Sequence, residues 1–353
     1  MDFELTEEQA ALREVSRNML AANCPPQLVR ALASAGNDVD DKLWQRAAEL
    51  GWMGLAVPVE HDGAGQGLVE LCLVAEEIGR AAAPGAFIDS ALIALALARS
   101  GQEGLVSGLA GGQLKASWAH HGSVAGSYDG GEFVLSGRAT AVQAAAAADW
   151  LLVTAACDNG RRQVLVKRTL ASIERRRTLD ETRRWYDVVL EDVRVEPAAV
   201  VTADEAEIQW LIDAAAVLTA ADALGAGERL LEMSVSHVLV REQFGRPLGS
   251  FQSVKHKVAD MLTTLKGARA ATYYAAMALD AGVPGAAVAS SAAKAFTGEG
   301  IATLAGEALQ AHGGIGFTWE HDLHLYLRRA KVDEMLYGAA SEHYERLVSL
   351  RQE

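Results

Sequence analysis

The order in which three sequence textures follow one another restricts the fold of this 353-residue chain more than any other feature. Residues 1–113 carry apolar side chains at helical spacing. Residues 114–202 hold short runs rich in Val and Leu, such as FVLSGRA and YDVVLEDVRV, which are typical of an antiparallel β sandwich or barrel. Residues 203–353 return to long, Ala-rich helical segments that favour a four-helix bundle. We therefore predict a mainly α chain with a middle β domain, divided at these boundaries.

Charge and cysteine usage exclude several classes of protein. The formal net charge of −14 disfavours nucleic acid and anionic lipid as partners. Charged residues or glycine interrupt every apolar run before it reaches the length of a membrane span. Cys24, Cys72 and Cys157 form no CxxC pair, which argues against a zinc site and a disulfide framework. The N-terminus is acidic and resembles no targeting signal. Together, these features predict a cytoplasmic protein with no metal site and no membrane contact.

The segment REQFGRPLGSFQ, residues 241–252, lies where two long helices are expected to meet. Arg241 offers a planar fork that suits a pyrophosphate, and Phe244 offers a ring. The helix start near Ser250 adds free backbone N–H groups for an anion. Taken alone, such a segment is more often a helix–helix turn with a surface arginine and one packed phenylalanine.

A second segment, QAHGGIGF at residues 310–317, follows another long helix. Two adjacent glycines allow a helix to end and allow the backbone to approach a ligand closely. Alone, the same pattern also fits an ordinary helix C-cap.

Together, at this spacing and in this domain order, the two segments resemble the acyl-CoA dehydrogenase family. The resemblance extends to LAVPVEHDGAGQGLVELCLVAEEIGRAAAPG (55–85) and LYLRRAKVDEMLYG (325–338), so it spans most of the chain. It implies a helical N-terminal domain, a middle β-barrel and a C-terminal four-helix bundle, with FAD as cofactor and an acyl-CoA as substrate. It also implies that seven residues reach across a subunit interface and contact the adenine and pyrophosphate end of a neighbour's FAD. These residues are Arg241, Gln243, Phe244, Gln252, Gln310, Gly313 and Gly314.

The reaction of this family needs a carboxylate base that removes the Cα proton of the thioester while a hydride leaves Cβ for the flavin. The family places this Glu after a Tyr near the end of the bundle, or on the first bundle helix. This chain has Gly338 at the first position, or Ala339 if the alignment shifts by one, and the second position falls near Ala215. Asp213 lies close by, but its shorter side chain and different helix face argue against it. We therefore predict no catalytic residue in this chain.

The segments expected to face the isoalloxazine ring also depart from the family pattern. A Thr-Glu-Pro…Gly-Ser-type loop and a Trp-Ile-Thr/Ser-Asn-type strand are replaced by SWAHHGSVAGSYDGG (117–131) and RATAVQAAAAADW (138–150). The chain thus resembles the shorter, non-catalytic subunit of α2β2 heterotetrameric members, which completes the FAD site of a homologous catalytic partner.

That resemblance carries two further expectations and leaves two alternatives. Heterotetrameric members often act on CoA thioesters of steroid side chains or ring remnants, and the family implies an electron-transferring flavoprotein as acceptor. The alternatives are a self-sufficient homotetrameric dehydrogenase that uses Asp213 or another carboxylate, and a flavin-free scaffold or acyl-CoA-binding protein.

Two other groups of residues attract attention and have simpler interpretations. His321 and His324 share a helix face, but no third ligand has matching spacing, so we expect solvated or capping roles. The arginines of residues 174–177, with Arg183 and Arg184, could attract a CoA phosphate. Such a run is more often a solvated strand edge that discourages aggregation, which is the interpretation we favour.

Overall fold

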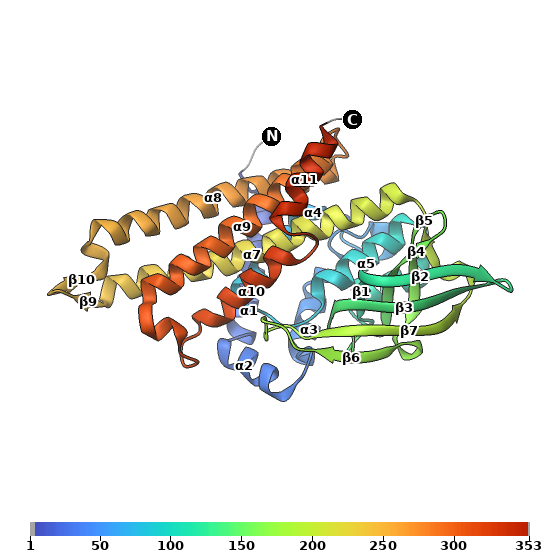
Figure 1. The fold of residues 1–353 in the computed structure, drawn as a ribbon, viewed down its shortest axis with the longest axis horizontal. Helices are drawn as coiled ribbons and strands as arrows, with labels where there is room; N and C mark the ends of the chain where they lie inside the picture. Colours follow the sequence, from blue (N-terminus) through green and yellow to red (C-terminus); the bar gives the residue numbers. More distant parts are fainter. Residues whose placement is uncertain (1–3, 352–353) are drawn as a thin grey trace.

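The computed structural model describes residues 4–351 and shows helical, β and helical parts in that order (Figure 1). Local signals fix the helix starts, since Thr6 and Gln9 form a capping box and Asp40 Oδ1 accepts from the N–H of Leu43 at 2.8 Å. The first part contains α1 (Glu7–Asn23), α2 (Pro26–Ala35), α3 (Asp41–Glu49), α4 (Leu68–Ala81), α5 (Phe87–Arg99) and α6 (Val106–Ala110), with 3-10 turns η1 (Trp52–Gly54), η2 (Val59–His61) and η3 (Glu103–Leu105).

The middle part is one eight-stranded sheet whose pairing runs β6-β7-β3-β2-β4-β5-β8, with β1 beside β4. Its strands are β1 (Ala116–Ala119), β2 (His121–Asp129), β3 (Glu132–Gln143), β4 (Trp150–Cys157), β5 (Gly160–Lys167), β6 (Ser172–Arg176), β7 (Trp185–Val195) and β8 (Val200–Thr202), with η4 (Arg168–Leu170) and η5 (Pro197–Ala199) between them. The sheet encloses its own apolar core. It is mixed rather than purely antiparallel, because β1 and β2 follow one another directly and both pair with β4 in parallel.

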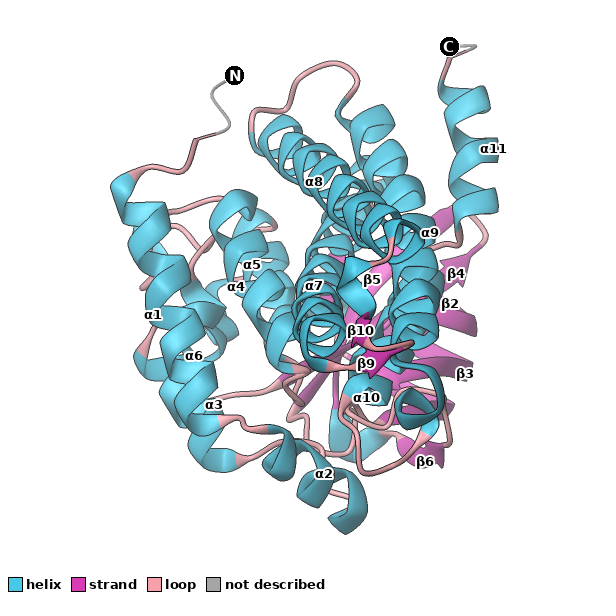
Figure 2. Ribbon diagram, turned by 90° about the vertical axis from the view of Figure 1, so that its left-hand side faces the viewer, coloured by secondary structure: helices cyan, strands magenta, loops and turns pink. Residues whose placement is uncertain are grey.

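The last part is the bundle, in which α7 packs against α4 on one side and α9 on the other (Figure 2). It contains α7 (Glu205–Val240), β9 (Glu242–Gln243), β10 (Arg246–Pro247), η6 (Leu248–Ser250), α8 (Gln252–Asp280), α9 (Ala286–His312), η7 (Gly313–Phe317), α10 (Leu323–Met335) and α11 (Ala340–Leu350). Contrary to the expectation from interrupted apolar runs, α7 is long and apolar enough to cross a membrane. However, 89% of its apolar window is buried within the protein, so α7 is the core helix of the bundle.

A buried ion-pair network joins the sheet to the bundle. Arg329 on α10 pairs with Asp222 on α7 through two 2.7 Å hydrogen bonds, and both side chains are 1% exposed. Arg183, in the loop before β7, pairs with Asp180 and with Asp333 on α10. The predicted solvated edge therefore holds for β6, whose arginines are exposed at the end of the sheet, but it is wrong for Arg183 and for Arg184, which are buried. Arg183 also bonds Asp333, and Arg184 bonds the carbonyl of Leu32, so each has a partner that is distant in sequence.

Candidate functional site: an exposed bundle end and a closed interior

The connection between α7 and α8 forms a small hairpin that projects from one end of the bundle (Figure 1). Phe244 and Gly245 form its two-residue loop, and both have positive φ, at 53° and 76°, as a type I′ turn requires. A phenylalanine in this backbone region is strained, and its ring is 92% exposed. The hairpin thus holds an aromatic ring in solvent at a cost in backbone energy.

The second predicted segment lies at the same end of the bundle. The ring of His312, the last residue of α9, stacks on that of His237 in the last turns of α7, with centroids 4.6 Å apart. The backbone N–H of Arg241 donates to the carbonyl of His237 at 2.9 Å. This stack, which the sequence did not reveal, brings the end of α7 and the end of α9 together. Burial lowers the pKa of both imidazoles, which favours uncharged rings.

All seven residues assigned by resemblance are exposed at this end. Gly313 has φ of 61°, and a Cβ added at Gly313 or Gly314 would meet no atom within 4 Å, so the backbone there is open to a ligand. Within residues 4–351, the Arg241 guanidinium has no hydrogen bond or ion pair. The seven are Arg241, Gln243, Phe244, Gln252, Gln310, Gly313 and Gly314.

Large apolar side chains surround these residues and are exposed as well. They are Leu239, Val240, Phe244, Ile315, Phe317 and Trp319, with exposed fractions from 49% to 92%. A free guanidinium, open glycine backbone and exposed rings fit the anionic and aromatic end of a dinucleotide cofactor. An apolar rim of this kind is also typical of a protein–protein contact. The bundle end therefore has the chemical character that the resemblance assigns to it, that of a surface for the adenine and pyrophosphate end of FAD.

The two positions of the family's base hold no carboxylate. Gly338 has φ of 107°, and a Cβ placed there would lie 2.9 Å from Nε2 of His343. Lys294 Nζ donates to the carbonyl of Gly338 at 2.9 Å, and burial lowers the pKa of this ammonium to about 8. Ala215 is 1% exposed in the core. No base is present at either place.

Asp213, the one alternative carboxylate, is already engaged. Its two carboxylate oxygens are both held by the guanidinium of Arg346 on α11, with the Nη2–Oδ2 distance at 2.8 Å. Gln209 donates to the same carboxylate at 3.2 Å. Both oxygens are therefore occupied by the guanidinium, so this carboxylate is not free to approach a substrate carbon. Asp213 therefore has a structural role that anchors α11.

The junction between sheet and bundle, where the segments 117–131 and 138–150 meet Tyr337, is narrow and half-buried. The cavity there has a volume of about 30 Å³, lined by residues of both segments together with Tyr337 and Arg183. Such a volume holds about two water molecules. The rings of Trp118, His120 and Tyr337 occupy the junction, so these residues do not fit a three-ring flavin.

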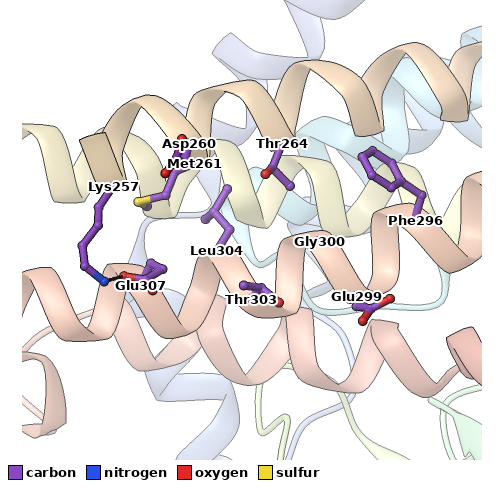
Figure 3. A pocket seen from close by; sticks show the side chains of 10 residues that line it. All are labelled: Lys257, Asp260, Met261, Thr264, Phe296, Glu299, Gly300, Thr303, Leu304 and Glu307. Carbon is purple, nitrogen blue, oxygen red and sulfur yellow. Dashed lines mark hydrogen bonds and ion pairs between the residues drawn. The ribbon is translucent and has the colours of Figure 1, made fainter. Parts of the chain in front are cut away.

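Larger grooves lie elsewhere on the molecule. One of about 450 Å³ runs between α8 and α9, with Phe296 and Met261 along it and the Lys257–Glu307 ion pair at one end (Figure 3). Another, of about 270 Å³, lies between α5, β8 and α7. Neither contains a residue assigned to the cofactor.

The chain consists of a helical part, a sheet and a bundle, and the end of the bundle is exposed, basic and aromatic. This arrangement is the architecture of flavin-dependent dehydrogenases. The sequence profile "Acyl-CoA dehydrogenase, N-terminal domain" matches residues 6–105, and "Acyl-CoA dehydrogenase, C-terminal domain" matches residues 206–348. The chain is 33% identical over 344 residues to acyl-CoA dehydrogenase IpdE2 of Mycobacterium tuberculosis, covering 97% of each chain. It therefore belongs to the acyl-CoA dehydrogenase family.

Two solved structures share the whole fold and more than a quarter of the sequence. One is the ChsE4-ChsE5 complex from Mycobacterium tuberculosis, with a TM-score of 0.94, 27% identity and coverage of 100% of this chain and 99% of that chain. The other is a variant of the Tcur3481-Tcur3483 steroid ACAD, with a TM-score of 0.91, 29% identity and 98% of each chain covered. The first is described as a complex, and the name of each structure joins two protein designations.

Proposed function

We propose that this chain is the accessory subunit of a heteromeric, FAD-dependent acyl-CoA dehydrogenase that introduces an α,β double bond into a CoA thioester. A homologous catalytic chain would hold most of the FAD and supply the base, in an α2β2 assembly. Bound FAD supplies the hydride acceptor for this desaturation. This chain would contribute Arg241, Gln243, Phe244, Gln252, Gln310, Gly313 and Gly314 to the adenine and pyrophosphate end of that cofactor.

The observation that carries this proposal is the contrast between the two halves of the flavin site. The bundle end presents open glycine backbone and, among residues 4–351, a guanidinium at Arg241 without a hydrogen bond or ion pair. The interior, in contrast, has a cavity of about 30 Å³ and glycine in place of the base at position 338. A self-sufficient enzyme would need both halves, and a flavin-free scaffold has no use for a strained, exposed Phe244 beside Arg241.

Finer features of the proposal rest on the relatives. The two-part names of the ChsE4-ChsE5 and Tcur3481-Tcur3483 structures support a homologous partner, and the steroid description of the second supports a bulky, steroid-derived acyl group. We extend the proposal to a cytoplasmic enzyme that passes electrons to an electron-transferring flavoprotein.

The test is an Arg241→Ala variant, co-expressed and co-purified with the homologous partner chain. A hydrogen bond to a charged group contributes about 1.5–3 kcal/mol, so we expect FAD affinity of the complex to fall by about 10- to 150-fold. Arg246→Ala is the matched control, because Arg246 lies in the same hairpin but stacks over the ring of Phe251 at 4.0 Å. Retained affinity in the Arg241 variant would favour the scaffold. A chain that is yellow and active without its partner would favour the self-sufficient enzyme.

A further inference from the structure

Four rings from distant parts of the chain meet at the junction of sheet and bundle, where the family's flavin ring would lie. Trp118, His120 and His121 come from the start of the sheet, and Tyr337 comes from the segment after α10. We propose that these four residues form an aromatic plug. The plug permanently occupies the flavin-ring position, so this chain's own site cannot bind flavin. This inference concerns the chain by itself and does not depend on its role in a partner's site.

The four rings pack on one another as a continuous cluster. The Tyr337 ring lies 5.7 Å from Trp118, 5.9 Å from His120 and 5.8 Å from His121, measured between centroids. His120 also lies 4.8 Å from both Trp118 and His121. These spacings fall in the range of favourable aromatic pairs, so the cluster contributes attraction beyond simple burial.

Hydrogen bonds fix the sheet side of the plug. Trp118 Nε1 donates to Thr154 Oγ1 at 3.1 Å, and His120 Nδ1 lies 3.2 Å from the same hydroxyl. The backbone N–H of Trp118 donates to the buried carboxylate of Asp89 at 3.1 Å. The rings therefore have defined positions and are not side chains that have merely collapsed into an empty site.

On the bundle side, hydrogen bonds hold Tyr337 in a strained backbone conformation. Tyr337 has φ of 55°, which tyrosine adopts only when the surroundings enforce it, whereas the φ of 107° at Gly338 is one that glycine adopts freely. Lys294 Nζ donates to the carbonyls of Glu334 at 3.0 Å and Gly338 at 2.9 Å. His343 Nε2 lies 3.0 Å from the carbonyl of Tyr337. These contacts hold the turn that directs the Tyr337 ring into the junction.

The plug is uncharged at neutral pH. Burial lowers the pKa of His120 to about 3, and burial also lowers that of His121. Burial raises the pKa of the Tyr337 phenol well above its ordinary value. Neutral rings tolerate this enclosed site, since none of them loses the hydration of a charge there. An assembly built with this chain would then carry flavin only where the partner's cradle is open.

The test uses lumiflavin, which has the flavin ring without ribityl or nucleotide, and the purified chain alone. We expect wild-type chain to leave lumiflavin fluorescence unchanged. The double variant Trp118→Ala/His120→Ala should bind the probe at least tenfold more tightly. The matched control, Tyr128→Ala, removes a ring of the same sheet that contacts Phe133, with centroids 4.9 Å apart, and should behave as wild type.

A second variant, Tyr337→Ala, opens the junction from the bundle side and repeats the test if the double variant does not fold. The proposal would be overturned if the wild-type chain binds lumiflavin and Tyr337→Ala does not change that binding. So would two folded, opened variants that bind no better than wild type. If neither variant folds, the wild-type titration decides alone: no binding supports the plug, and saturable binding overturns it.

Discussion

Replacing Gly338 with glutamate would restore a carboxylate at the position where the family carries its base. Gly338 has φ of 107°, a backbone conformation that costs a non-glycine residue of order 1–3 kcal/mol. The new Cβ would also lie 2.9 Å from His343 Nε2, and that ring is held by its contact with the carbonyl of Tyr337. At about 2–4 °C per kcal/mol, we expect the melting temperature to fall by roughly 2–12 °C.

We also expect no dehydrogenase activity from Gly338→Glu purified alone, because the aromatic rings leave no room for a hydride acceptor beside the new carboxylate. The control is Ala339→Glu, which has ordinary backbone angles of −72° and 165° and should shift the melting temperature by less than about 2 °C. Thermal unfolding and an acyl-CoA turnover assay with an artificial electron acceptor give both readouts. Turnover without a partner, or an unchanged melting temperature, would refute this reasoning.

Three further predictions concern stability. Arg329→Met leaves Asp222 buried without its partner and should lower the unfolding free energy by about 3–5 kcal/mol in chemical denaturation. Asp280→Ala removes the carboxylate that accepts from the N–H of Leu68 at 2.8 Å and so caps α4, at a cost of about 1–2 kcal/mol by the same assay. The pKa of His120 is about 3 in the folded chain and 6.5 in the unfolded chain. Below pH 6.5 the unfolded chain therefore binds a proton that the folded chain does not, and the free energy of unfolding falls as the pH drops. The wild type should therefore lose roughly 2 kcal/mol more than His120→Phe between pH 6.5 and 5, and equal losses would contradict this assignment.

Elements with local signals were predictable from the sequence. The capping box at Thr6, the start of α3 after Asp40 and the long helices of the bundle all follow from residues a few positions apart. Helix α2 and strands β1, β6 and β8 are short, and strand β2 is rich in Gly and Ser, so these segments carry no clear hydrophobic period that would predict them.

Several contacts of the candidate site could not be predicted from the sequence. Residues at the bundle end were assigned by resemblance and not by a physical pattern, and the stack of His237 on His312 joins two helix ends 75 positions apart. Asp213 was judged a poor base from its side chain and helix face alone, and nothing in the sequence indicates its partner Arg346, which lies 133 positions away. The plug likewise brings Trp118 to Tyr337, a contact that no local period encodes. Burial of charge and filling of a cavity depend on non-local packing, which a single sequence does not display.

The most direct test of the account is the FAD content of this chain, measured by absorbance after purification alone and after purification with its homologous partner. We predict a colourless chain alone and a yellow complex with about one FAD per pair of chains, because the bundle end completes the partner's site while the plug closes this chain's own. A yellow chain that binds FAD alone and is bleached by an acyl-CoA would contradict the account, and it would identify a complete enzyme.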